Sequence, residues 1–246
     1  MKPNMDDLKS IINSLHKEKY SGADVVFLAG SVIRGESTKT SDLDIVVVYD
    51  SIPNAYRDSY RYSNWPVEAF VHDPQTLKYF IDKVDGPSGV PSLASMVSEG
   101  IALPSPTELS RRLRKLANDI LDAGPPRWEP NDIDKSRYFI TDLIEDLREP
   151  RTLNEIYAIA SQLYNLIANH FFRSKGLWSA KGKTIPRRLR KIDAQFFSKF
   201  EAAFGALFTQ GITGDVIVLA MDVLSEHGGF LFEGYRVEAP KEWRIR

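Results

Sequence analysis

The chain has 246 residues, of which 43% are hydrophobic and 26% charged, and its formal net charge is -1. This composition is typical of a soluble globular protein with one large or two small domains, and the balanced charge provides no global basic field for nucleic acid. The absence of cysteine excludes disulfides, thiolate metal sites and cysteine nucleophiles. No apolar run approaches a membrane span, and the first residues lack a signal peptide's apolar core, so we expect a cytoplasmic protein without membrane contact.

The first 104 residues mix helical and strand patterns, which indicates an α/β domain. Apolar residues at helical spacing predict a helix over 5–20, and short β-branched runs predict buried strands at 25–28 and 45–48. Between these strands we expect a short helix over 31–35. The tyrosine-rich segment 53–64 is interpreted as a loop or a short helix. Further along, the patterns predict a strand over 65–72, helices over 75–84 and 93–99, and a short strand at 101–103.

The second part of the sequence is helical throughout. Pro104 and Pro106 interrupt both helices and strand ladders, so we place a domain boundary there, with domains at 1–104 and 105–246. Long amphipathic patterns joined by short polar segments predict an all-α helical bundle for the second domain. The helices are expected at 107–121, 131–148, 152–173, 186–208 and 215–226.

The most informative stretch lies between the two buried strands. Asp42 and Asp44 flank Leu43 at the start of the second strand, so both carboxylates lie on one face of it. Two adjacent carboxylates repel each other unless a cation lies between them, and hard oxygen ligands suit Mg²⁺ or Mn²⁺. Gly30 permits close approach of the backbone to a ligand, and Ser31 could present amides and a hydroxyl to phosphate oxygens. An anion site and a metal site joined by one short connection indicate nucleotide chemistry.

This stretch resembles the signature of the polymerase-beta-type nucleotidyltransferase superfamily. The resemblance rests on Gly30-Ser31, Arg34-Gly35, Ser41 and the segment Asp42-Leu43-Asp44, and it covers about the first hundred residues. It implies a small mixed sheet in the first domain, as well as transfer of a nucleoside monophosphate from an NTP, expected to be ATP. It also implies that Asp42 and Asp44 bind Mg²⁺ or Mn²⁺, while Gly30, Ser31, Arg34 and Ser41 contact the nucleotide.

Glu68 is a charged residue within an otherwise apolar strand. Burying a charge without a partner is costly, so Glu68 needs an explanation. The resemblance implies a third carboxylate on a later strand, and Glu68 matches that position either as a metal ligand or as a general base. The alternative for Glu68 is an exposed position on an edge strand. Asp73 is a rival third carboxylate, but Asp73-Pro74 is typical of a helix start, with Asp as the N-cap.

A basic segment from Arg173 to Lys191 contains eight cationic residues and no acidic one. Enzymes similar to antibiotic adenylyltransferases often use a lysine of the helical domain to hold the triphosphate, and Lys183 is the first candidate here, with Lys181 second. The alternatives are a solvated basic surface or a patch for an RNA acceptor.

The acceptor is the least determined part of the reaction. Asp142, Glu145, Asp146 and Glu149 could form an acidic wall for a cationic small molecule such as an aminoglycoside, although we favour a solvated charged face. We expect transfer to a hydroxyl of a small molecule. The alternatives are an RNA or protein acceptor, as in a toxin-like enzyme, and a non-catalytic nucleotide-binding module.

Overall fold

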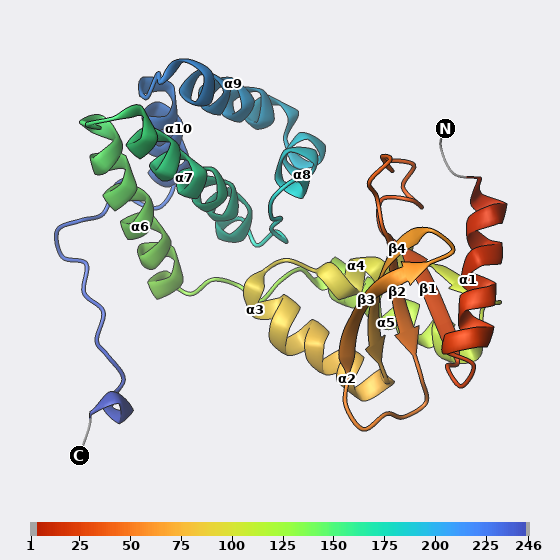
Figure 1. The fold of residues 1–246 in the computed structure, drawn as a ribbon. Coiled ribbons are helices and arrows are strands. Elements are labelled where there is room, and N and C mark those ends of the chain that lie inside the picture. The colour runs from red at the N-terminus through yellow and green to blue at the C-terminus, as the bar shows by residue number, and fades with distance from the viewer. Residues whose placement is uncertain (1–3, 245–246) are drawn as a thin grey trace. The chain divides into compact units, whose positions relative to one another are not determined.

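The computed structural model describes residues 4–244 and divides into two compact units after Pro126 (Figure 1). The domain boundary expected after residue 104 stays a prediction. In the structure the helix that follows residue 104, Glu108–Ala123, packs with the first unit. Within residues 4–244 no helix is both long and apolar enough to cross a membrane.

The first unit is built on a five-stranded mixed sheet in the order β3-β4-β2-β1-β5. Only β2 and β4 run parallel, and every other neighbouring pair is antiparallel. The small mixed sheet implied by the resemblance is therefore confirmed. The strands are β1 (Val25–Ala29), β2 (Leu43–Val48), β3 (Tyr56–Tyr62), β4 (Trp65–His72) and β5 (Ile101–Leu103).

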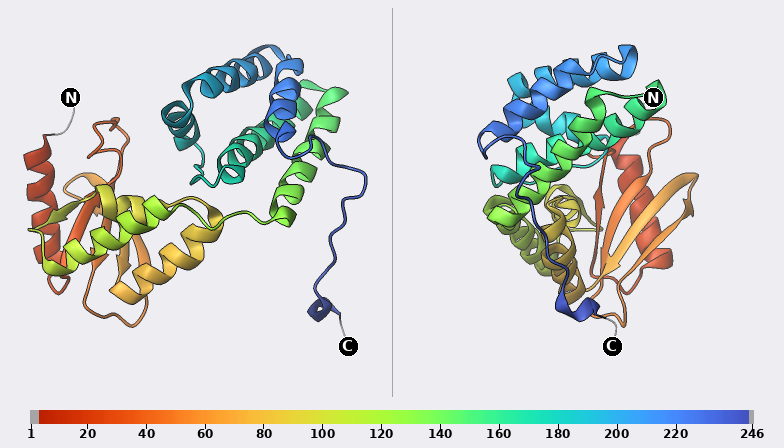
Figure 2. Two further views of the ribbon diagram at one scale, coloured as in Figure 1. Left: turned by 180° about the vertical axis from the view of Figure 1, so that it is seen from behind. Right: turned by 90° about the vertical axis from the view of Figure 1, so that its left-hand side faces the viewer.

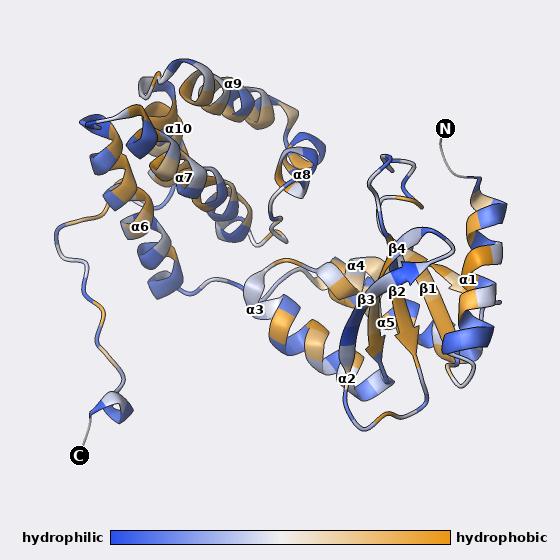
Figure 3. Ribbon diagram, in the orientation of Figure 1, coloured by the Kyte–Doolittle hydropathy of each residue, from blue (hydrophilic) through white to orange (hydrophobic). Residues whose placement is uncertain are grey.

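Helices cover both faces of this sheet. One face packs against α1 (Met5–Lys19), which buries Leu8, Ile12 and Leu15 there. The opposite face is covered by three other helices, and the two views in Figure 2 show them across the sheet from α1. These helices are α2 (Pro74–Phe80), α4 (Ser92–Glu99) and α5 (Glu108–Ala123). Because both faces are covered, β1 and β2 are apolar along nearly their whole length, as Figure 3 shows.

Two local expectations for the first unit are wrong, and a third holds only in part. Segment 53–64 contains the edge strand β3, which is partly exposed along its length and is coloured as hydrophilic in Figure 3. Residues 31–35 form a turn, closed by a bond from the Glu36 amide to the Ser31 carbonyl, and not a helix. The helix expected over 75–84 is present, but after Phe80 it continues as a π-helical turn (Ile81–Asp85), which is followed by the short helix α3 (Gly86–Ser88).

The second unit is a helical bundle around one apolar core, as the sequence predicts. Its helices are α6 (Pro130–Arg148), α7 (Leu153–Ser174), α8 (Thr184–Ile192), α9 (Ala194–Gln210) and α10 (Gly214–Ser225). The single helix expected over 186–208 is wrong, because the chain is extended at Asp193, whose carboxylate accepts the Phe196 amide and starts α9. After α10 the chain has no regular element until a 3₁₀ turn at Lys241–Trp243.

Candidate active site

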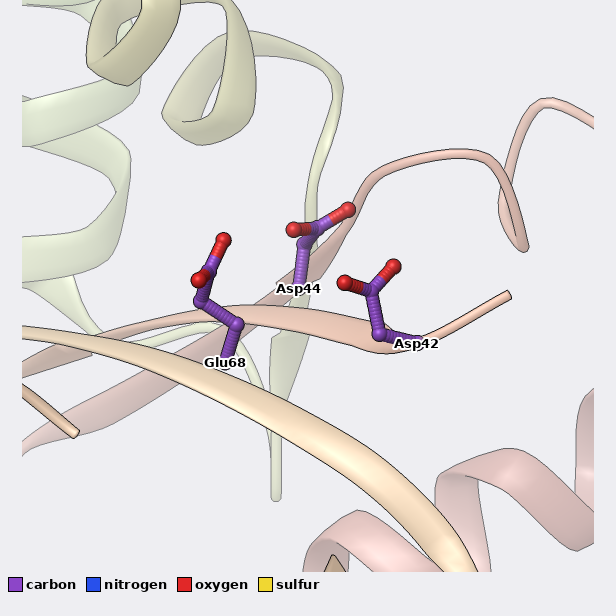
Figure 4. A group of neighbouring side chains, drawn as sticks. All are labelled: Asp42, Asp44 and Glu68. Carbon is purple, nitrogen blue, oxygen red and sulfur yellow. The ribbon is translucent and has the colours of Figure 1, made fainter. Parts of the chain in front are cut away.

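Three carboxylates meet on the face of the sheet that carries α2, α4 and α5. Asp44 in β2 and Glu68 in β4 are direct partners in the parallel ladder, and Asp42 stands just before β2 on the same side. One carboxylate oxygen from each residue lies within 4.8 Å of the other two. Figure 4 shows all three side chains pointing to one side of the strands. A set of three hard oxygen donors in this arrangement fits a divalent cation such as Mg²⁺ or Mn²⁺.

Gly30 makes room for this cluster at the end of β1. Its φ is +78°, which favours glycine, and its strand neighbour Ala29 pairs with Asp44. A Cβ at residue 30 would overlap Oδ2 of Asp44 and would lie 2.8 Å from Cγ of the same side chain. The glycine is therefore required by both the backbone conformation and the close approach of Asp44.

Ser31 and Ser41 hold the two ends of the connection between β1 and β2 together. The Ser31 hydroxyl donates to Oγ of Ser41 across 3.2 Å, and the Thr38 amide donates to the same Oγ across 2.8 Å. The connection thus folds back next to the carboxylates, with Gly30 and Ser31 on one side and Ser41 and Asp42 on the other. Ser31 opens a turn, so an anion site here would rely on turn amides and hydroxyls and not on a helix N-terminus.

Arg34 lies in the same turn and is engaged by two carboxylates. Its Nε donates to Oε2 of Glu36 across 3.4 Å, and its Nη1 donates to Oε2 of Glu99 across 3.1 Å. All three side chains are substantially exposed. Contact with a phosphate would require Arg34 to exchange these exposed ion pairs, which cost little to break.

Glu68 has a cationic partner that the sequence analysis missed. Both Nε and Nη2 of Arg57 in β3 donate to Oε1 of Glu68, with a distance of 2.8 Å from Nε. The guanidinium also lies 5.1 Å from the ring centre of Phe70. The available sequence signal was the pair Ser63-Asn64, whose residue types favour turns; in the structure both residues have positive φ, as in a tight β-hairpin.

Asp73, the rival third carboxylate, does not join the cluster. Its Oδ1 accepts the Thr76 amide at 2.8 Å and caps α2, while Oδ2 accepts the Ile52 amide at 3.2 Å. The Thr76 bond is the main reason why the pKa of Asp73 is lowered. The two candidate lysines, Lys181 and Lys183, lie in the second unit just before α8, and both are exposed.

Comparison with known proteins bears on the segment that holds these carboxylates. Residues 8–84 match the family described as "Nucleotidyltransferase domain". This part of the chain is a nucleotidyltransferase domain. The resemblance to the polymerase-beta-type superfamily is thereby confirmed, and the matched range includes Gly30, Asp42, Asp44 and Glu68.

The chain is similar to a nucleotidyltransferase-like protein from Exiguobacterium sibiricum 255-15, with 14% identity and a TM-score of 0.44 over 89% of this chain and 73% of that one. A search of curated proteins finds no match.

Proposed function

We propose that the nucleotidyltransferase domain transfers a nucleoside monophosphate from an NTP, with ATP as the first candidate, to an acceptor hydroxyl in the presence of Mg²⁺ or Mn²⁺. The observation that carries this proposal is the convergence of Asp42, Asp44 and Glu68 within 4.8 Å of one another, next to the turn that starts at Gly30. A divalent cation held by these carboxylates would offset part of the negative charge of the triphosphate and stabilise the charge that develops on the attacking and leaving oxygens.

The chain's own residues have separate tasks in this reaction. Ser31 and Ser41 would hold phosphate oxygens in the turn, and Arg34 would exchange Glu36 and Glu99 for phosphate. The acceptor oxygen forms a bond to the α-phosphorus as the bond to the β-phosphate bridging oxygen breaks, and pyrophosphate leaves. The hydroxyl proton passes to a base, for which Glu68 is the nearest candidate if it does not serve as a metal ligand.

The acceptor is proposed to be a cationic small molecule, similar to an aminoglycoside. In support, an open hollow of about 450 Å³ on the surface of the second unit is lined by four acidic residues and a single arginine. The acidic residues are Glu145, Asp146, Glu149 and Glu155. An RNA acceptor is the second candidate, and it is supported by the exposed cations around α8: Lys181, Lys183, Arg187, Arg190 and Lys191.

The test is pyrophosphate release from each of the four NTPs with Mg²⁺ or Mn²⁺, in the presence of aminoglycosides, total tRNA or cell-extract protein. We expect one NTP and one acceptor pool to support turnover, and Asp42→Asn and Asp44→Asn to lose at least about a thousandfold of it. Asp50→Asn is the matched control, because Asp50 is exposed beyond the other end of β2. Turnover that survives in either active-site variant would refute the assignment, and nucleotide binding without release in any pool would favour the non-catalytic alternative.

A further inference from the structure

Arg57 and Arg61 stand in nearly equivalent places relative to Glu68, but only one of them contacts it. Ser59 of β3 is the direct ladder partner of Glu68, so Arg57 and Arg61, two residues away on either side, are diagonal neighbours on the same face. Arg57 donates twice to Oε1 of Glu68, whereas Arg61 donates to the backbone carbonyl of Asn64. One carboxylate of the acidic cluster is thus paired with an arginine from the edge strand.

We propose that Arg57 is an internal cation that competes with the divalent metal ion for Glu68. This inference rests on the metal site of the proposed function. In the metal-free protein Arg57 offsets the repulsion between Glu68 and the neighbouring Asp44, its ladder partner. When a metal ion binds, Arg57 releases Glu68, because a guanidinium and a divalent cation at one carboxylate repel each other.

The contacts of Arg57 make this exchange feasible. Its side chain is 61% exposed, while that of Glu68 is 21% exposed, and β3 has no neighbouring strand on its outer side. An ion pair with one partner so exposed is weak, so its loss should change metal affinity by a factor of about two to five. The guanidinium also lies 5.1 Å from the ring centre of Phe70, and this contact can hold Arg57 close to the cluster after it releases Glu68. The Arg57–Glu68 ion pair therefore lowers the affinity for the metal ion but does not prevent its binding.

The experiment is a titration of the full-length protein with Mn²⁺ in the absence of nucleotide, in which electron paramagnetic resonance measures free Mn²⁺. We expect Arg57→Ala to bind Mn²⁺ about two to five times more tightly than the wild type. It should also unfold at a lower temperature without metal and show a larger Mn²⁺-induced rise. Arg61→Ala removes the same charge from the same face and should change Mn²⁺ affinity much less. An equal gain in both variants, or no gain in Arg57→Ala, would overturn the proposal.

A double-mutant cycle identifies the residue through which Arg57 acts. In a Glu68→Gln background the Arg57→Ala substitution should no longer raise Mn²⁺ affinity, because the contested carboxylate is gone. A gain that persists in this background would show a general charge effect and contradict the competition.

The outcomes separate this inference from the proposed function. If Mn²⁺ binding responds to Arg57→Ala as expected but the protein releases no pyrophosphate, the competition is supported and the transferase reaction is refuted. If neither the wild type nor Arg57→Ala binds Mn²⁺, the competition is refuted even if turnover is found.

Discussion

The carboxylate of Asp44 packs against the backbone of Gly30 and fills the space that a Cβ on residue 30 would occupy. The backbone of Asp44 is fixed by pairing with β1 on one side and β4 on the other. Its side chain could therefore avoid a Cβ on residue 30 only by rotating away from the acidic cluster. The glycine at the end of β1 and the carboxylate on β2 therefore form one steric unit, and we expect substitutions at either position to affect the other.

Gly30→Ala should destabilise the first unit and weaken Mn²⁺ binding. The left-handed φ costs roughly 1–2 kcal/mol for an alanine, and the overlap with Asp44 adds about 1–3 kcal/mol. Urea unfolding followed by circular dichroism measures the first effect, and the Mn²⁺ titration measures the second.

Two glycines serve as controls for that substitution. Gly182 also has a positive φ, but nothing lies within 4 Å of an added Cβ, so Gly182→Ala isolates the backbone cost. Gly22→Ala meets only an ordinary contact at 3.5 Å with Tyr49, and it should be neutral or slightly stabilising. A Gly30→Ala variant as stable as Gly22→Ala would contradict the steric argument.

Substitutions of Asp73 and Glu68 should have opposite effects, one on the unfolding free energy and the other on Mn²⁺ affinity. Asp73→Ala removes the cap of α2 and the acceptor for the Ile52 amide, so we expect a loss of about 1–2 kcal/mol in unfolding free energy with unchanged Mn²⁺ affinity. Glu68→Gln should show the reverse, with a stability change under about 1 kcal/mol and clearly weaker Mn²⁺ binding. If Asp73→Ala weakened Mn²⁺ binding and Glu68→Gln did not, the third carboxylate would have been misassigned.

His170 should make the second unit sensitive to acid. Burial, and then repulsion from His227 and Arg137, lower the pKa of His170 to about 4. The unfolded chain takes up the proton near pH 6.5, whereas the folded one stays neutral until about pH 4. The contribution of neutral His170 to the unfolding free energy is therefore fully present above pH 6.5. It is lost as the pH falls towards 4, by an amount on the order of 3 kcal/mol.

The measurement for His170 is the unfolding free energy between pH 4 and pH 7. His170→Asn cannot titrate in this range and should flatten the pH dependence. Ser136→Ala removes the hydroxyl 2.9 Å from Nδ1 of His170 but keeps the imidazole, so it should lower stability at every pH with the slope unchanged. An unchanged slope in His170→Asn would assign the acid sensitivity to other groups.

Lys183 is predicted to contact the triphosphate. Loss of a hydrogen bond to a charged group should raise the KM for the NTP about tenfold in Lys183→Ala, with a smaller rise in Lys181→Ala. Lys191→Ala, at the other end of α8, is the control for general loss of positive charge. Equal effects in Lys183→Ala and Lys191→Ala would point to a diffuse basic surface instead.

Much of the fold was predictable because local patterns and tertiary packing agree. The runs at 25–28 and 45–48 are apolar throughout since both faces of the sheet are covered, and α1 shows its buried stripe directly in Leu8, Ile12 and Leu15. The approach of Asp42 to Asp44 also follows from strand periodicity. The direct pairing of Asp44 with Glu68 does not, because ladder register depends on contacts between segments far apart in the sequence.

The missed features arise where exposure hides the pattern. Strand β3 contains no aliphatic residue, so its composition resembled that of a loop, and Arg57 was not recognised as a neighbour of Glu68. The break between α8 and α9 was missed because apolar residues continue on both sides of it. Asp193 was the available signal, since Asp is a preferred N-cap.

The exposed edge strand has a further consequence for how molecules of this protein behave at high concentration. The outer side of the seven-residue strand β3 has no neighbouring strand among the described residues, so its backbone groups can pair with a strand of another molecule, which is a common start of aggregation. Arg57, Asp58 and Arg61 place charges on both faces of β3 and discourage such pairing. A variant without Arg57 and Arg61 would therefore have both an altered acidic cluster and an edge strand that pairs more readily with other molecules. Its solubility would fall even where its fold is intact.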